Sequence, residues 1–84
     1  MSRELSGASP TDQDRVGATL RTMRELRGFK PDQFASAIGI SRPYLANIEA
    51  GRRPLSNILL ARAAATLQVE QIAIMLPSSE QVPA

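Results

Sequence analysis

One stretch of this chain, residues 31–49 (PDQFASAIGISRPYLANIE), constrains the possible folds more than any other. Apolar residues recur there at helical spacing on both sides of a glycine: Phe34, Ala35 and Ile38 before it, and Tyr44, Leu45 and Ile48 after it. The glycine, Gly39, is of the residue type that most readily adopts the left-handed conformation in which many helices end. The stretch therefore predicts two short helices separated by a tight turn.

The residues of the predicted turn fit the start of a second helix. Ile40 is apolar and is expected to pack back against the core. Ser41 stands where a helix N-cap belongs, because its hydroxyl can accept a hydrogen bond from a free backbone N–H, and Pro43 suits a first helical turn. Two short helices joined by a turn of about three or four residues with a glycine are typical of a helix-turn-helix unit that reads DNA.

The rest of the chain predicts three further helices around this pair. Their expected ranges are about Asp12–Arg27, Leu55–Leu67 and Val69–Leu76, while the central pair opens at Lys30–Pro31 and at about Arg42–Ala50. Thr11 or Asp12 can cap the first helix, and Gly28 follows its end. Residues 1–11 are expected to be a flexible arm, residues 12–76 the folded domain, and residues 77–84 a flexible polar tail.

Apolar residues at helical spacing outline the core of the outer helices. They are Val16, Leu20, Met23 and Leu26 in the first helix, and Leu55, Leu59, Leu60, Ala63, Ala64 and Leu67 in the fourth. Phe29 can tuck into the core behind Gly28, whereas Gly17 is expected to weaken the first helix modestly. No alternating β-branched stretch is long enough for a sheet, so the chain is predicted to be all-α.

The composition excludes several classes of protein. The 84 residues allow one domain, and its small core would gain from dimerisation. Cysteine and histidine are both absent, which removes disulfides, thiolate metal sites, and the commonest general base and zinc ligand. We therefore expect no enzyme, cofactor, metal or small-molecule ligand. The chain has no apolar run of about 18 residues and no signal-like N-terminus, which indicates a soluble cytoplasmic protein without a membrane partner.

Positive charge is concentrated around the central stretch. Between Arg15 and Arg53, eight basic residues stand against three acidic ones, for a net charge of +5, whereas the rest of the chain carries −3. A polyanion partner would require such a distribution. Taken alone, the charge is equally consistent with a solvated basic face.

Three short sequence motifs follow one another in the middle of the chain. They are R-x-x-R-G at 24–28, F-A-x-x-I-G-I-S at 34–41 and Y-L-x-x-I-E-x-G-R-R-P at 44–54, followed by ILLARAAATLQV. In combination they resemble the Cro/C1-type (XRE-like) helix-turn-helix regulators over about Val16–Leu76. The resemblance implies a compact five-helix, lambda-repressor-like DNA-binding domain, usually dimeric on DNA. It also implies that the second helix of the central pair lies in the major groove.

The resemblance implies a set of base-reading residues: Ser41, Arg42, Pro43, Tyr44 and Asn47. Arg42 can grip O6 and N7 of guanine together or contact a phosphate, and Asn47 matches adenine N6 and N7 unless its amide is solvated or phosphate-bound. Ser41 is expected to cap the helix, contact DNA, or do both. Pro43 offers only apolar contact, for example with a thymine methyl group. Tyr44 either is purely structural or extends its hydroxyl to a phosphate.

A second set of residues is implied to contact phosphates: Arg24, Lys30, Arg52, Arg53, Ser56 and Asn57. Arg52 and Arg53 follow the DNA-reading helix, where they could instead complement its C-terminal dipole. The family commonly pairs an arginine of the first helix with a glutamate at the end of the third, so Arg24 and Glu49 are expected to form a partly buried ion pair. Glu49 is accordingly interpreted as structural.

The last predicted helix has more apolar residues than one buried face of a short helix requires. The candidates for a dimer interface are Ile72, Ile74, Met75 and Leu76, with complete burial in the monomer as the alternative. A two-fold dimer would place two DNA-reading helices about 34 Å apart on an inverted repeat. Gln68 replaces the glycine often found before this helix in the family, which leaves the angle of the helix open.

These patterns predict a sequence-specific regulator of transcription that binds double-stranded DNA. The expected function is a repressor of bacterial or phage origin that occupies its operator as a homodimer. A DNA-binding antitoxin, or another interaction protein with the same fold, is the alternative. RNA binding is disfavoured because the motif lacks interleaved aromatic residues for base stacking.

Overall fold

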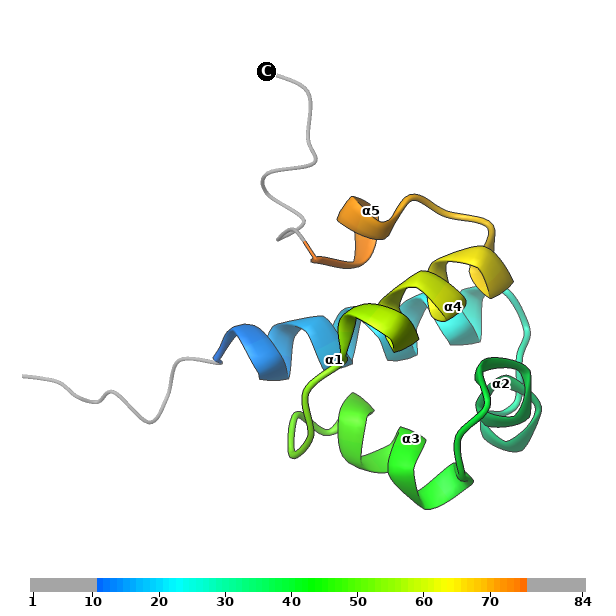
Figure 1. Cartoon of the computed structure of the whole chain (residues 1–84), viewed down its shortest axis with the longest axis horizontal. Helices are drawn as coiled ribbons and strands as arrows, with labels where there is room; N and C mark the ends of the chain where they lie inside the picture. The colour runs from blue at the N-terminus through cyan, green and yellow to red at the C-terminus, as the bar shows by residue number, and fades with distance from the viewer. Residues whose placement is uncertain (1–10, 76–84) are drawn as a thin grey trace, which may run out of the picture.

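The computed structural model of the protein describes residues 11–75, which form five α-helices and no strand in that range (Figure 1). The helices are α1 (Asp12–Leu26), α2 (Pro31–Ile38), α3 (Arg42–Glu49), α4 (Asn57–Leu67) and α5 (Gln71–Met75). The predicted all-α, five-helix fold is confirmed. The expected arm apart from Thr11, the expected tail, and Leu76 lie outside the described residues. No helix between residues 11 and 75 is long and apolar enough to cross a membrane.

Polar side chains cap the starts of α1 and α3, as the sequence predicts. The Thr11 hydroxyl accepts a hydrogen bond from the Asp14 N–H at 3.0 Å, and the Asp14 carboxylate accepts one from the Thr11 N–H at 3.1 Å. This reciprocal pair is a capping box, which satisfies backbone donors that have no partner within the helix. The Ser41 hydroxyl accepts from the Tyr44 N–H at 3.2 Å and begins α3 in a similar way.

The start of α4 lies two residues after the approximate start at Leu55 that the sequence predicts. The helix begins at Asn57, not at Leu55, because the hydroxyl of Ser56 caps it by accepting from the Leu59 N–H at 3.2 Å. Leu55 still packs against the core from the segment before the helix. Its apolar character therefore reflects burial in a loop, which helical spacing alone does not distinguish from burial in a helix.

A residue in the left-handed helical conformation, Gln68, separates α4 from α5. Gln68 has a φ of 59°, and the Val69 N–H bonds back to the Ala64 carbonyl at 3.0 Å, so α4 closes and α5 begins only at Gln71. The predicted start of α5 at Val69 is therefore wrong. For a residue other than glycine, the left-handed conformation costs about 1 kcal/mol. The surrounding turn holds Gln68 there, although glycine would adopt the same conformation without that strain.

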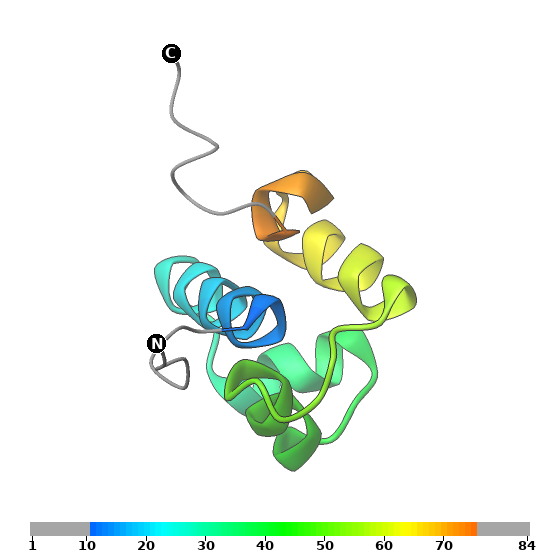
Figure 2. The same cartoon turned by 90° about the vertical axis from the view of Figure 1, so that its left-hand side faces the viewer.

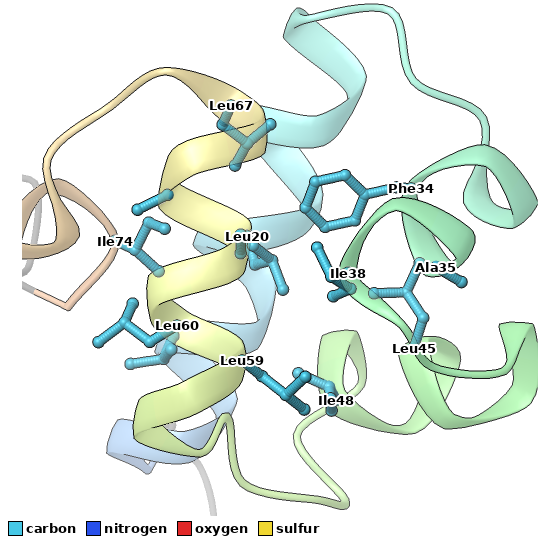
Figure 3. Close-up of a cluster of buried hydrophobic side chains, with 13 residues drawn as sticks. Leu20, Phe34, Ala35, Ile38, Leu45, Ile48, Leu59, Leu60, Leu67 and Ile74 are labelled. Atoms are coloured by element: carbon cyan, nitrogen blue, oxygen red, sulfur yellow. The ribbon is translucent and has the colours of Figure 1, made fainter.

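Buried apolar side chains from all five helices meet in one core (Figure 3). The core residues are Val16, Leu20, Phe34, Ala35, Ile38, Leu45, Ile48, Leu59, Leu60, Ala63, Ala64, Leu67 and Ile74. Apart from Ile74, helical spacing in the sequence predicts each of them. Phe29 and Ile40 pack against this core from the two turns around α2, as expected.

Two apolar residues, Leu26 and Ile74, differ in burial from what the sequence favours. Leu26 was expected in the core but is 80% exposed, because α1 turns the side carrying Gly17, Leu20 and Arg24 towards the other helices. For Ile74 the sequence leaves open a dimer contact or complete burial in the monomer, and the structure buries it fully against the other core residues, so the dimer-interface assignment of this residue is wrong.

Gly17 lies at a close crossing between α1 and α3. A Cβ atom at this position would collide with the Ile48 carbonyl oxygen and would come within 2.9 Å of the Glu49 carbonyl oxygen. Both obstacles are backbone atoms, which cannot move aside as a flexible side chain can. Gly17 therefore allows the two helices to approach, and interpreting it only as a weak point in α1 is wrong.

The helices are arranged so that α3 and α5 lie on opposite sides of the molecule. In Figures 1 and 2, α1 and α4 run through the middle, with α3 below them and α5 above them. The contacts agree with this arrangement, since α1 packs on both α3 and α5, while α2 packs on α3 and α4. The outer surface of α3 is therefore left uncovered by α5.

We expect Gly17→Ala to lower the free energy of unfolding by about 3 kcal/mol, because the added methyl group overpacks the crossing of α1 and α3. Helix propensity alone gives the opposite sign, with alanine more stable than glycine by about 1 kcal/mol. Urea unfolding followed by circular dichroism would measure the difference. Ala18→Gly, at the exposed neighbouring position, is the control and should cost only about 1 kcal/mol. Stabilisation by Gly17→Ala would contradict the close crossing.

Candidate nucleic-acid interface

The helix α3 has one buried side and one exposed side. Leu45 and Ile48 are 0% and 1% exposed and hold the helix in the core. The residues of its first turn, Arg42, Pro43 and Tyr44, are all exposed. The amino-terminal end of α3 is therefore presented to solvent on a rigid support, which is the geometry that a major-groove reading helix requires.

The Ser41 hydroxyl has a structural role at this end of the helix. It accepts a hydrogen bond from the Tyr44 N–H. Ser41 therefore caps α3, which is one of the roles that the sequence predicts for it. A hydroxyl can still donate its own hydrogen to a DNA oxygen while it accepts. Tyr44 as a whole is 42% exposed, so this residue is not part of the buried core.

The structure divides the basic residues into two groups. Those with partners in the fold are Arg15, Arg21, Arg24, Arg27 and Arg62, which bond to carboxylates or to backbone carbonyls. The helix-turn-helix segment and its flanking turns contain cations that have no carboxylate partner within residues 11–75. They are Lys30, Arg42, Arg52 and Arg53. All four are exposed, and they lie before α2, at the start of α3, and in the turn after α3. Positive charge without an internal counter-charge therefore flanks the exposed end of α3 and its following turn.

The turn after α3 is tied to Asn47. Two backbone N–H groups donate to the Asn47 carbonyl, from Arg52 at 2.9 Å and from Arg53 at 3.2 Å. The side chains are joined as well, because Nε of Arg52 donates to Oδ1 of Asn47 at 2.8 Å. From the sequence, Asn47 is expected at a base and Arg52 at a phosphate, and their hydrogen bond to each other is not predicted. The spacing of five residues across a glycine turn is the only sequence signal for it.

The first helical turn of α1 also contacts the turn that follows α3. Nε2 of Gln13 donates to the Gly51 carbonyl at 2.8 Å. Gly51 has a φ of 82°, and a Cβ atom there would collide with the side chain of Asp14 and come within 2.9 Å of its Cα. This glycine is therefore required both for the backbone conformation and for the close approach of α1. Nothing in the sequence pattern marks Gln13 or Asp14 as supports of the site.

Arg24 and Glu49 form the expected ion pair between α1 and the end of α3. Nε of Arg24 lies 2.8 Å from Oε2 of Glu49, and Nη2 lies 3.2 Å from Oε1, which is a two-point contact. Nη1 donates to the Phe29 carbonyl at 2.8 Å. The hydrogen bond to Glu49 is the main cause that raises the pKa of Arg24 above its ordinary value, and burial opposes it.

The phosphate-binding role expected for Arg24 is wrong. Only 5% of Arg24 is exposed, and its three guanidinium nitrogens all contact groups inside the fold. A phosphate could reach it only if the ion pair opened. The buried cation is instead neutralised by Glu49, as buried charges generally must be.

The other expected phosphate ligands lie on the surface. Lys30 is exposed immediately before α2, and Asn57 is exposed in the first turn of α4. Ser56 is exposed too, although its hydroxyl accepts the capping hydrogen bond of α4. Free N–H groups at such helix starts attract anions.

Comparison with known proteins identifies the family. The family model described as "Helix-turn-helix domain" matches residues 15–73, which is more than half of the chain. The chain therefore belongs to the helix-turn-helix family. The resemblance to helix-turn-helix transcriptional regulators seen in the sequence is confirmed, and regulators of this family bind DNA and are not enzymes.

Three similar proteins illustrate the relationship. The ImmF control region 10 kDa protein of Bacillus phage phi105 is 34% identical over 59 residues, covering 70% of this chain and 66% of the phage protein. The uncharacterized HTH-type transcriptional regulator YazB of Bacillus subtilis (strain 168) is 38% identical over 53 residues, covering 63% of this chain and 77% of YazB. The restriction-modification controller protein C.AhdI from Aeromonas hydrophila has a crystal structure that superposes with a TM-score of 0.71 at 27% identity, covering 75% of this chain and 96% of C.AhdI.

We expect Arg24→Ala to destabilise the protein by about 3–5 kcal/mol, because it leaves the Glu49 carboxylate buried without a partner. Arg21→Ala is the matched control, since Arg21 is on the same helix and pairs with Glu25 at 3.2 Å, with its side chain 63% exposed. That exposed pair should contribute about 0.5 kcal/mol or less. Thermal unfolding of both variants would measure the contrast. Equal losses would show that the ion pair with Glu49 is no more important than a surface pair.

Proposed function

We propose that this protein is a sequence-specific repressor of transcription that occupies double-stranded DNA by placing α3 in the major groove. One observation carries the proposal. The four helix-turn-helix cations without a carboxylate partner in the described residues are exposed before α2, at the start of α3 and in the turn after α3, while the basic residues of α1 are used within the fold. Protein–DNA affinity depends largely on such unneutralised cations.

The first turn of α3 supplies the proposed base contacts. Arg42 is exposed at its start, and a guanidinium there can donate to O6 and N7 of guanine together. Pro43 offers an apolar surface to a thymine methyl group. Ser41 donates its hydroxyl hydrogen, Tyr44 extends its hydroxyl to the DNA backbone, and Asn47 contacts a base from one and a half turns further along.

The surrounding residues are proposed to set the register on DNA. Lys30, Arg52 and Arg53 contact phosphates on the two sides of the groove, since exposed cations lie before α2 and after α3. Ser56 and Asn57 present the start of α4 to a further phosphate. These contacts hold the protein in position and add little sequence preference of their own.

The protein is proposed to act as a homodimer through α5. Ile72 and Met75 are 60% and 40% exposed, although both are apolar. Met75 also lines a shallow pocket with Val16, Pro54 and Leu55, between α1 and the segment before α4. A second copy covering this surface would bury apolar area that a small domain otherwise leaves in water. A two-fold dimer of this kind would read an inverted repeat.

Repression follows from occupancy of a promoter in the cytoplasm of a bacterium. The similar phage protein is named for a control region, and YazB is named as a transcriptional regulator, which supports a role in gene control for this chain. Abundance and dimerisation would set how much of the operator is occupied. A stable heteromer without affinity for DNA would instead favour the role of an antitoxin or another interaction protein.

We expect the protein to shift DNA from its own upstream region in a gel-shift assay at about 0.15 M salt. Arg42→Ala should cost about 1–3 kcal/mol on the preferred site and should relax the preference at one base pair. Lys30→Ala should weaken binding to all sequences alike, because a phosphate contact carries no base information. Arg21→Ala is the control for the loss of a positive charge outside the interface. An unchanged sequence preference in Arg42→Ala would contradict its base-reading role.

We expect Ile72→Asp to convert the homodimer to a monomer, because it places a charge in the proposed apolar contact. Analytical ultracentrifugation over a range of concentrations would measure the association. Leu26→Asp is the matched control, since Leu26 is an apolar residue with 80% exposure at the end of α1. A monomeric parent protein, or equal dissociation by both substitutions, would exclude α5 as the dimer contact.

A further inference from the structure

We propose that Arg52 is a positioning residue that orients the amide of Asn47 and so sets which base Asn47 selects. The inference rests on the proposed function, because it concerns how α3 reads DNA. It revises the expectation that Asn47 recognises adenine. The observation behind it is the hydrogen bond of 2.8 Å from Nε of Arg52 to Oδ1 of Asn47.

The chemistry of the two side chains determines the direction of the amide. A guanidinium group carries only donors, so the atom of Asn47 that faces Nε of Arg52 must be its oxygen. The Nδ2 group is then directed away from Arg52. Within residues 11–75 it donates no hydrogen bond, so both of its hydrogens are available to a partner outside the domain.

Several contacts hold the pair in this orientation. The backbone N–H of Arg52 donates to the carbonyl of Asn47 at 2.9 Å, so the two residues are joined through both their backbones and their side chains. Asn47 is half-buried, which limits the rotation of its side chain. The turn is also anchored from α1, because Gln13 donates to the carbonyl of Gly51. The amide orientation is therefore set before DNA arrives.

The orientation favours some bases over others. Recognition of adenine by asparagine needs Oδ1 to accept from N6 while Nδ2 donates to N7. Arg52 takes one of the two lone pairs of that oxygen, and its positive charge beside the oxygen repels the positively polarised hydrogen of adenine N6. The amide therefore presents mainly its two donor hydrogens. Guanine, with O6 and N7, and thymine, with O4, offer acceptors for these hydrogens. We infer that Asn47 selects guanine or thymine over adenine at its base pair.

The test is a complete single-base substitution series of the preferred site, with affinities measured for the full-length parent protein and four variants. Asn47→Ala identifies the base pair that Asn47 reads. Arg52→Lys keeps the charge but lacks the Nε donor, and it should shift the preference at that pair towards adenine by about tenfold, with the other positions unchanged. Arg53→Lys is the matched control, because Arg53 is the next residue and its side chain makes no hydrogen bond within residues 11–75. Because Arg53 is proposed to contact a phosphate, Arg53→Lys should change the affinity for all sequences alike and leave every base preference unchanged.

The double variant Arg52→Lys/Asn47→Ala separates positioning from a direct phosphate contact. If Arg52 acts through Asn47, the lysine should cause no further shift in preference when the amide is absent. The inference is overturned if Arg52→Lys leaves the preference at that pair unchanged and only weakens binding to all sequences alike. It is also overturned if the parent protein already prefers adenine at that pair, or if Asn47→Ala alters no base preference. A parent protein without any sequence preference would overturn the proposed function itself, which distinguishes that failure from a failure of the role of Arg52 alone.

Discussion

The contact between α1 and α3 is the constraint on which the candidate DNA interface depends. Gly17 lets the two backbones approach, and the ion pair of Arg24 with Glu49 joins the same helices beside that crossing. The second contact is directional, since a guanidinium and a carboxylate meet at two points. Together they fix both the separation of α3 from α1 and its orientation. A reading helix needs such support, because small displacements change which base edges its side chains reach.

The same contact explains why the positive charge is divided between two roles. Arg24 neutralises a buried carboxylate, and Arg15 donates to the Met75 carbonyl at 2.7 Å, so these cations of α1 hold α3 and α5 in place. The cations near α3 have no carboxylate partner among the described residues and are free to meet a polyanion. A count of basic residues therefore overstates the number of cations available to DNA, because several of them have partners within the fold.

The turn after α3 belongs to the interface as much as the helix does. Gly51 brings the chain close to α1, and Gln13 donates to its carbonyl. Arg52 follows directly and bonds to Asn47 on the helix. The orientation of one potential base-reading amide thus depends on a residue in a loop and on a helix more than thirty residues earlier, because the turn is held from both sides.

The sequence by itself determined the five helices, most of the core, the Thr11 and Ser41 caps and the family, because these depend on spacing and on local backbone chemistry. Tertiary structure alone decided the burial of Ile74, the exposure of Leu26 and the closed environment of Arg24. It also decided that Gly17 lies at a helix crossing and that Arg52 bonds to Asn47. Periodicity shows that a helix has an apolar side, but which atoms face that side depends on the approach of helices distant in the chain.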